Sequence, residues 1–125
     1  DWAVASINNL KIDKHNILNA SILAMHKALD KLKLRPEFIV VDGNKFNPYR
    51  RTKHECIING DDKFLSIAAA SILAKNYRDR YMTKLSKIYS EYSWETNFGY
   101  PTRAHREGIK RYGITKYHRK SFKLL

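Results

Sequence analysis

Two aspartates, each placed shortly after an apolar run, are the residues of this chain best suited to chemistry. Asp42 directly follows the apolar run at 38–41, and Asp61 follows a second run at 56–58 and a short turn. Runs of this length that end in turn residues are typical of buried strands. If the two strands are parallel neighbours, both carboxylates lie at the same end of a sheet, where they can share a hard cation.

Two other interpretations of these aspartates remain open. The connection from Gly43 to Lys53 has eleven residues, close to the minimum of about a dozen for a crossover between parallel strands. A hairpin would instead put the two acids at opposite ends of the sheet. Each acid also has a glycine neighbour, and such dipeptides are common in turns, so both could be turn formers without a catalytic role.

Three helices are predicted around these strands. Asp13 or Asn16 could cap an amphipathic helix whose apolar residues are spaced alternately by four and three positions. A long helix is predicted over about 66–89, and its first half, rich in Ala and Ser, would allow close approach to a sheet. A third helix begins after Thr102, a good cap, and stops at Gly113.

Positive charge is concentrated in the second part of the chain, which has 125 residues and a formal net charge of +12. Residues 75–125 contain 13 Lys and Arg against 4 Asp and Glu, whereas residues 1–74 contain 11 against 8. This asymmetry, together with many aromatic residues, predicts nucleic-acid binding, although a basic face can also be merely solvated. Because no membrane span, secretory signal or second cysteine is present, a cytoplasmic protein without membrane association is expected.

A set of short motifs resembles one known family in order and in spacing. The motifs are Val41-Asp42-Gly43-Asn44, Gly60-Asp61, the segment 67–75, Gly99-Tyr100-Pro101-Thr102 and His118-Arg119-Lys120-Ser121-Phe122. Together they closely resemble bacterial ribonuclease HII over essentially the whole chain. The resemblance implies an α/β fold, with the mixed sheet and flanking helices of ribonuclease H and a helical carboxy-terminal part. It also implies a catalytic domain at 1–90 and a basic, helical substrate-binding extension at 91–125.

The same resemblance implies an activity. Family members are endoribonucleases that hydrolyse the RNA strand of RNA–DNA hybrids, including ribonucleotides embedded in duplex DNA, and a monomer is expected for the full-length protein. Asp42 and Asp61 match two of the four carboxylates that hold Mg²⁺ or Mn²⁺ in the family. Two such ions can activate water and stabilise the leaving oxygen, and oxygen ligands suit both metals.

Substrate binding is implied for a further group of residues in the matched motifs: Asn44, Lys75, Tyr100, His118, Arg119 and Ser121. Tyr100 matches the tyrosine that lies against the sugar at the RNA–DNA junction in the family. The alternative is that Tyr100 is a half-buried loop aromatic. Recognition of a 2′-hydroxyl is what separates RNA from DNA at such a site.

One part of the family pattern does not occur in this sequence. The other two carboxylates belong to an Asp-Glu-X-Gly-Arg-Gly motif in an amino-terminal strand, and residues 2–7 resemble the family's third strand. The resemblance therefore implies an incomplete sheet without its first two strands. We expect residues 1–125 alone to be neither a stable monomer nor an active nuclease. The alternatives are a non-catalytic basic nucleic-acid-binding domain, with Asp42 and Asp61 as turn residues, and an inactive fragment.

Overall fold

The two apolar runs form a parallel sheet in the computed structural model, which describes all residues from 1 to 125. Strand β1 (Phe38–Asp42) pairs with β2 (Lys53–Ile57), so that Asp42 lies opposite Ile57. The predicted strands and their parallel arrangement are confirmed, although β2 begins three residues before the predicted run. Ile39 and Val41 point to the same face because strand residues alternate, and they form a small hydrophobic cluster with Tyr49.

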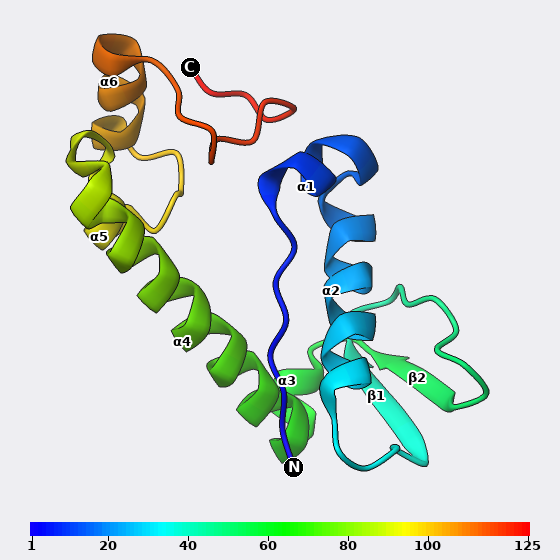
Figure 1. Cartoon of the computed structure of the whole chain (residues 1–125). Helices are drawn as coiled ribbons and strands as arrows, with labels where there is room; N and C mark the ends of the chain where they lie inside the picture. The colour runs from blue at the N-terminus through cyan, green and yellow to red at the C-terminus, as the bar shows by residue number, and fades with distance from the viewer.

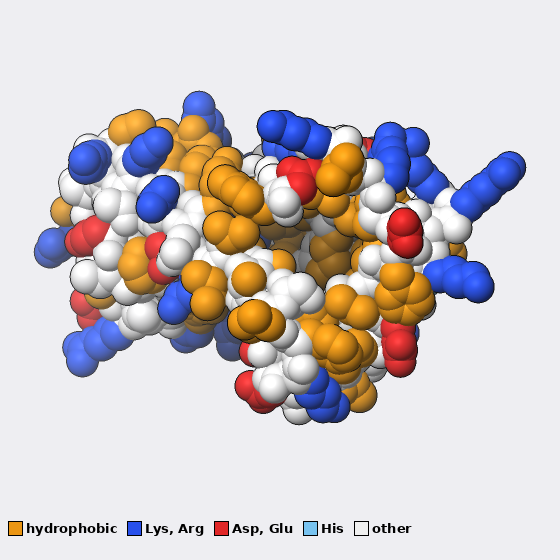
Figure 2. All heavy atoms as spheres, turned by 90° about the horizontal axis from the view of Figure 1, so that it is seen from below, with side chains coloured by type: hydrophobic (Ala, Val, Ile, Leu, Met, Phe, Trp, Pro, Cys, Tyr) orange, Lys and Arg blue, Asp and Glu red, His pale blue; other side chains and the backbone are white.

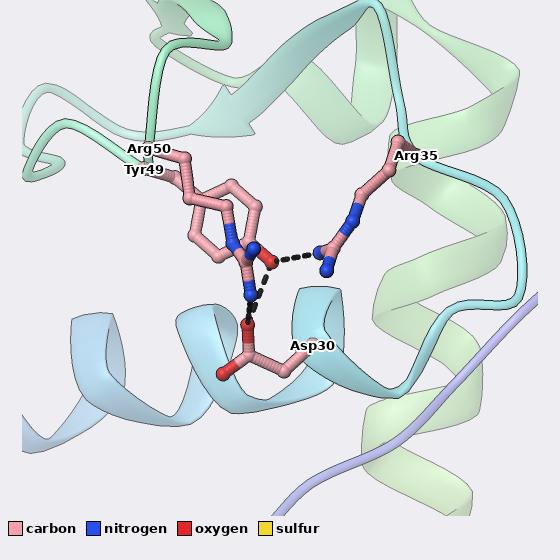
Figure 3. Close-up of polar contacts among 4 residues, drawn as sticks. All are labelled: Asp30, Arg35, Tyr49 and Arg50. Atoms are coloured by element: carbon pink, nitrogen blue, oxygen red, sulfur yellow. Dashed lines mark hydrogen bonds and ion pairs between the residues drawn. The ribbon is translucent and has the colours of Figure 1, made fainter.

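The short crossover between the strands is fastened to the preceding helix by Tyr49 (Figure 3). The buried Tyr49 hydroxyl donates a hydrogen bond to Asp30 Oδ1 (2.7 Å) and accepts one from Arg35 (3.0 Å), while Arg50 pairs with Asp30 at 3.3 Å. The Tyr49 hydroxyl and then Arg50 lower the pKa of Asp30. Residues 43–52 are thereby held in place without a crossover helix, which explains how so short a connection joins parallel strands.

Two helices precede the sheet, α1 (Asn9–His15) and α2 (Ile17–Lys31). The Asn16 side chain caps α2 by accepting a hydrogen bond from the Asn19 amide (3.0 Å), so this predicted cap is confirmed. The other candidate, Asp13, lies inside α1 and contacts the carboxy-terminal tail instead. Helix α1 was not predicted, because seven residues are too few to show a helical period.

The long helix α4 (Leu65–Ile88) follows the short helix α3 (Gly60–Lys63) and agrees with the predicted span within one residue. Its last third packs into a second hydrophobic cluster, whose buried members are Met82, Leu85, Tyr92, Trp94 and Ile109. Two of these residues belong to α4 and three follow it, so α4 and the later helical segments share this cluster. The Ala- and Ser-rich first half was expected to pack closely on a sheet. It does not, and its residues Leu65 and Ile72 are 87% and 60% exposed.

Three further helical segments complete the carboxy-terminal part: η1 (Ser90–Tyr92), α5 (Trp94–Asn97) and α6 (Arg103–Tyr112). Thr102 caps α6 by accepting a hydrogen bond from the His105 amide (3.3 Å), and Gly113 follows the helix with a positive φ of 79°. Both predicted ends of this helix are confirmed. Gly108 lets α6 approach the preceding segment, because a Cβ there would clash with the Glu91 carbonyl.

The predicted strand at residues 2–7 does not form. These residues are extended but pair with no strand, and β2 is the only hydrogen-bonded neighbour of β1. Polar contacts hold the segment instead, including a hydrogen bond from Lys31 Nζ to the Val4 carbonyl (2.9 Å). The prediction was wrong because a strand needs a neighbour for its backbone groups, and residues 1–125 place none there.

The elements enclose an open groove rather than a filled interior. In Figure 1, α4 diverges from α2, and the extended amino-terminal segment runs between them. The groove has a volume of about 550 Å³ and is lined mainly by residues 4–12, by α2 and α4, and by the carboxy-terminal tail. Figure 2 shows apolar side chains around this hollow and Lys and Arg side chains near the outer edge. None of the helices combines the length and the apolar character needed to cross a membrane.

The surface area shows how open this arrangement is. The chain exposes 9243 Å², whereas a compact monomer of 14.7 kDa would expose about 6,900 Å². Only 17 of the 125 residues are buried. Two small clusters therefore provide most of the hydrophobic stabilisation, and a large apolar surface remains in contact with water.

We predict that residues 1–125, produced alone, do not form a cooperatively folded monomer. The free edge of β1 and the exposed apolar residues of α4 favour association with other chains. Light scattering coupled to size-exclusion chromatography and thermal unfolding followed by circular dichroism would measure this. A monomer with one sharp unfolding transition would contradict the prediction.

Candidate functional site

Parallel pairing brings the ends of β1 and β2 together, and with them the two predicted acids. Asp42 is the last residue of β1, and α3 begins at Gly60, shortly after β2 ends. The Gly60 amide donates a hydrogen bond to Asp42 Oδ1 (2.9 Å), so Asp42 is held against the residue that immediately precedes Asp61. Both aspartates are exposed. The structure therefore places both aspartates at the end of the sheet where β1 and β2 finish, as the parallel interpretation requires.

Gly60 and Asn59 shape the turn that presents Asp61. Asn59 adopts a left-handed conformation (φ 55°), which turns the chain from β2 into α3. Gly60 is buried, and a Cβ at this position would lie 2.8 Å from Ile67 Cδ1 and 3.5 Å from the Asp42 Cα. Asp61 thus lies in the first turn of a short helix rather than at the end of a strand. Asp62 follows it in the helix and points about 100° away around the axis.

The donor atoms at this edge fit a hard divalent cation but do not complete its coordination. Asp42 Oδ1 accepts the Gly60 hydrogen bond, whereas Oδ2 has no protein partner. Carboxylate oxygens are the ligands that Mg²⁺ and Mn²⁺ prefer. The structure contains no group of three or more His, Cys, Asp or Glu residues arranged to hold a metal. Asp42 and Asp61 therefore offer two carboxylates at this end of the sheet, and water, substrate phosphate or further ligands would fill the other positions of a six-coordinate Mg²⁺.

Tyr100 combines an exposed ring with a fixed backbone in the loop between α5 and α6. The residue is 72% exposed, which disagrees with the alternative of a half-buried packing residue. Its amide donates to the Asn97 carbonyl (2.9 Å), and its carbonyl accepts hydrogen bonds from the Thr102 amide (2.8 Å) and His105 Nδ1 (2.9 Å). A rigid, exposed aromatic is suited to contact a ligand with little loss of conformational entropy.

Two arginines lie close to the Tyr100 loop. Arg78 of α4 donates a hydrogen bond to the Phe98 carbonyl (3.4 Å). Burial and then the Arg78 guanidinium lower the pKa of Arg119, whose guanidinium lies 4.0 Å from the Phe122 ring centroid. Two guanidinium groups beside an exposed tyrosine form a positively charged surface that suits phosphate oxygens.

The acids and the Tyr100 loop lie at different positions along α4. Helix α3 and Asp61 precede the first turn of α4, whereas a Cβ on Gly99 would lie 3.2 Å from Arg78 Nη2. At 1.5 Å per residue, Arg78 is about 20 Å along the helix from its start. Two other predicted residues are exposed. Asn44 lies two residues after Asp42, and Lys75 lies in the middle of α4. The predicted site residues therefore do not converge on a single point.

The basic tail is held in place by α1, far away in the sequence. Asp13 accepts hydrogen bonds from the Ser121 hydroxyl (2.6 Å) and amide (2.9 Å), which lower the pKa of Asp13. Asn9 Nδ2 donates to the carbonyls of Lys116 (2.7 Å) and His118 (3.1 Å). We call these contacts the tail clasp. The Ser121 hydroxyl is engaged in this clasp rather than free for a ligand.

His118 is buried, unlike the other predicted substrate-binding residues. It is 4% exposed, and its Nε2 lies 3.2 Å from His105 Nε2. Burial, and then the neighbouring His105, lower the pKa of His118 from its usual 6.5 to about 4. The implied direct contact between the His118 side chain and a substrate does not agree with this burial. His105, also buried, was missed because a histidine within a helix gives no signal in a single sequence.

A solved structure has the same fold. The crystal structure of ribonuclease H2 from Pyrococcus horikoshii OT3 matches with a TM-score of 0.73, over 94% of this chain and 63% of that chain, at 24% sequence identity. This likeness defines the class of the fold as α/β and ribonuclease H-like. The two-stranded sheet of residues 1–125 is an incomplete form of it.

The sequence comparisons identify the family. The family model for Ribonuclease HII matches residues 3–125. Ribonuclease HII of Christiangramia forsetii is 60% identical over 99% of this chain and 63% of its own length, and that of Parabacteroides distasonis is 56% identical over 99% and 62%. Ribonuclease HII of Pelagibacter ubique is 50% identical over 97% of this chain and 65% of its own length. The chain belongs to the ribonuclease HII family and spans slightly less than two thirds of these relatives.

We predict that the full-length protein loses stability in acid because of His118. As the pH falls from about 6.5 to about 4, the unfolded chain takes up a proton on His118 that the folded protein does not, so the free energy of unfolding decreases. The neighbours that face the ring are His105, Thr115, Tyr92 and Trp94, and no carboxylate is hydrogen-bonded to it. Thermal unfolding between pH 4 and 7 measures the effect.

His118→Gln is the matched variant for this measurement, because its side-chain amide can donate to His105 without titrating. The variant should show a shallower decrease of Tm over the same pH range. Equal slopes in the variant and the wild type would mean that His118 does not cause the acid sensitivity.

Proposed function

We propose that this chain provides part of the active site and much of the substrate-binding surface of an endoribonuclease. The proposed reaction is hydrolysis of the RNA strand of RNA–DNA hybrids, including ribonucleotides embedded in duplex DNA. Family membership supports the proposal. The observation that carries it is the hydrogen bond between the Gly60 amide and Asp42, which holds Asp42 and Asp61 at one end of the sheet.

The proposed cofactor is Mg²⁺ or Mn²⁺, with Asp42 and Asp61 among its ligands. When bound, such ions make water nucleophilic and stabilise the charge on the leaving oxygen. Asp42 is already oriented by the Gly60 amide, so its second oxygen can bind a cation without reorganisation of the strand end. The chain spans 63% of its relative from Christiangramia forsetii, and we propose that the remaining ligands lie outside residues 1–125.

The proposed substrate surface is the basic carboxy-terminal part, with residues 91–125 as a binding extension. Arg78 and Arg119 would contact phosphates, and the exposed Tyr100 ring would lie against the sugar at the RNA–DNA junction. Lys75 and Asn44 are exposed and available for the same duplex. Ser121 would contribute indirectly, since its hydroxyl holds the tail through Asp13.

Dependence on divalent metal separates this function from the second candidate, a basic nucleic-acid-binding domain without catalysis. The net charge of +12 supports either function. A binder needs no divalent metal, and its affinity falls with monovalent salt alone. A nuclease of the proposed kind cleaves the RNA strand only when Mg²⁺ or Mn²⁺ is present.

We predict that Asp42→Asn in the full-length protein lowers cleavage of a duplex with one embedded ribonucleotide more than about 100-fold, the upper end of the loss seen on removing outer-shell partners. Asparagine retains an oxygen that can accept the Gly60 hydrogen bond, so the strand end keeps its position while the charge is lost. Binding of the uncleaved duplex should change little. Single-turnover cleavage with Mn²⁺ and equilibrium binding without metal measure the two effects.

Asp62→Asn is the matched control for Asp42→Asn. It also replaces one carboxylate by an amide, but at a residue that is not proposed to bind metal. It should cleave at a rate close to that of the wild type. Cleavage by the Asp42 variant at the wild-type rate would exclude Asp42 as a metal ligand.

We also predict that Tyr100→Ala in the full-length protein weakens discrimination between a duplex with an embedded ribonucleotide and plain duplex DNA. The ring is 72% exposed, so its loss should change Tm little. Tyr112→Ala removes another exposed tyrosine, 57% exposed at the end of α6, and serves as the control. If Tyr100→Ala lost stability and retained its discrimination, Tyr100 would be a packing residue.

A further inference from the structure

Two buried histidines link separate segments of the carboxy-terminal part. His105 lies in α6 and is 7% exposed, and His118 lies in the tail and is 4% exposed. Their Nε2 atoms are 3.2 Å apart, and Trp94 Nε1 lies 3.3 Å from His105 Nε2. Burying imidazoles among aromatic rings costs free energy unless their nitrogens are hydrogen-bonded. The proposed chemistry at Asp42 and Asp61 does not account for this pair.

The hydrogen-bond partners define one neutral tautomer for each ring. The Thr115 amide donates to His118 Nδ1 (2.9 Å), so the His118 proton is on Nε2, from which it is donated to His105 Nε2. Trp94 Nε1 donates to the same His105 nitrogen. The His105 proton must therefore be on Nδ1, which donates to the Tyr100 carbonyl (2.9 Å). All four ring nitrogens are used, and the hydrogen bonds run in one direction from the tail to Tyr100.

Tyr100 is the point at which this network reaches the exposed loop. The Tyr100 carbonyl has two hydrogen-bond partners. One is the Thr102 amide in the same loop, and the other is His105 Nδ1, which connects the loop to α6. At the opposite end, the tail clasp fixes the His118 backbone, because Asn9 Nδ2 donates to the His118 carbonyl (3.1 Å). The position of the Tyr100 backbone thus depends on the packed core and on the tail together.

We infer that the His105–His118 pair positions Tyr100 for contact with nucleic acid by linking the Tyr100 carbonyl, through two imidazoles, to the carboxy-terminal tail. The inference rests on the proposed function, which assigns Tyr100 to the substrate. Both histidines are positioning residues, since they are buried and act through Tyr100. Their contribution concerns binding and discrimination rather than the chemical step, because both rings are buried and act on the loop only through the Tyr100 carbonyl.

Two substitutions of His105 separate the role in positioning from the role in packing. His105→Gln places an amide where it can accept from Trp94 and His118 but cannot reach the Tyr100 carbonyl. His105→Asn places an amide where it can donate to the Tyr100 carbonyl but loses the contact with His118. Both are made in the full-length protein, and Ala104→Gln, at an exposed neighbouring position of α6, is the control.

We expect His105→Gln to retain Tm while hydrogen exchange at the Tyr100 and Thr102 amides becomes faster without nucleic acid. Its Kd for a duplex with one embedded ribonucleotide, measured without divalent metal, should rise about five-fold, the equivalent of one lost hydrogen bond of about 1 kcal/mol. Its KM should rise while kcat is unchanged. His105→Asn should show the reverse, with a lower Tm and nearly normal exchange and Kd.

The outcomes distinguish the inference from the function on which it rests. If Kd and loop exchange followed Tm in both variants, the pair would be a packing element and the inference would be wrong. If the wild type discriminated the embedded ribonucleotide but His105→Gln left loop exchange unchanged, positioning would fail and the proposed function would stand. If His105→Gln loosened the loop but the wild type did not discriminate, the positioning of Tyr100 would stand and the proposed function would fail.

Discussion

The hydrogen bond from the Gly60 amide to the Asp42 carboxylate is the constraint on which the candidate site depends. This contact, 2.9 Å long, links the turn that follows β2 to the end of β1. The Gly60–Asp42 hydrogen bond forms only if β1 and β2 are parallel. The parallel arrangement in turn depends on the crossover at residues 43–52, which the Tyr49–Asp30 hydrogen bond holds against α2. Glycine also suits position 60, since a Cβ there would require the Ile67 side chain to move. The position of two exposed acids thus follows from buried contacts elsewhere.

Elements with a strong local signal were predictable from the sequence, and elements that depend on a neighbour were not. Strand β1, helix α4 and the ends of α6 follow from apolar runs, helical periodicity and capping residues. Helices α3 and α5 have four residues each, too few for a period to be visible. Residues 2–7 have the composition of a strand, but composition cannot supply a pairing partner. The apolar residues of the first half of α4 remain exposed for the same reason.

The candidate site shows a similar division between residue identity and residue role. The position of Asp42 and Asp61 after apolar runs predicted that they lie at one end of the sheet, and parallel pairing places Asp42 against Gly60, the residue before Asp61. The family motifs selected His118 and Ser121, yet one is buried against His105 and the other is bonded to Asp13. A motif records that a residue is needed but does not say whether it touches a ligand or holds another residue. His105 carries no recognisable pattern, and only the three-dimensional contacts reveal it.

The tail clasp has a consequence for the order in which the molecule assembles. Its hydrogen bonds join residues that are 107 to 109 positions apart in the chain. Closing a loop of that length costs about 4 kcal/mol of chain entropy, while contacts within helices and between β1 and β2 close much shorter loops. We therefore expect the clasp to form late, after the two hydrophobic clusters have shortened the effective distance between its ends. Arg119 and the histidine pair reach their final positions only at that stage, so the contacts made by these residues report the completion of folding.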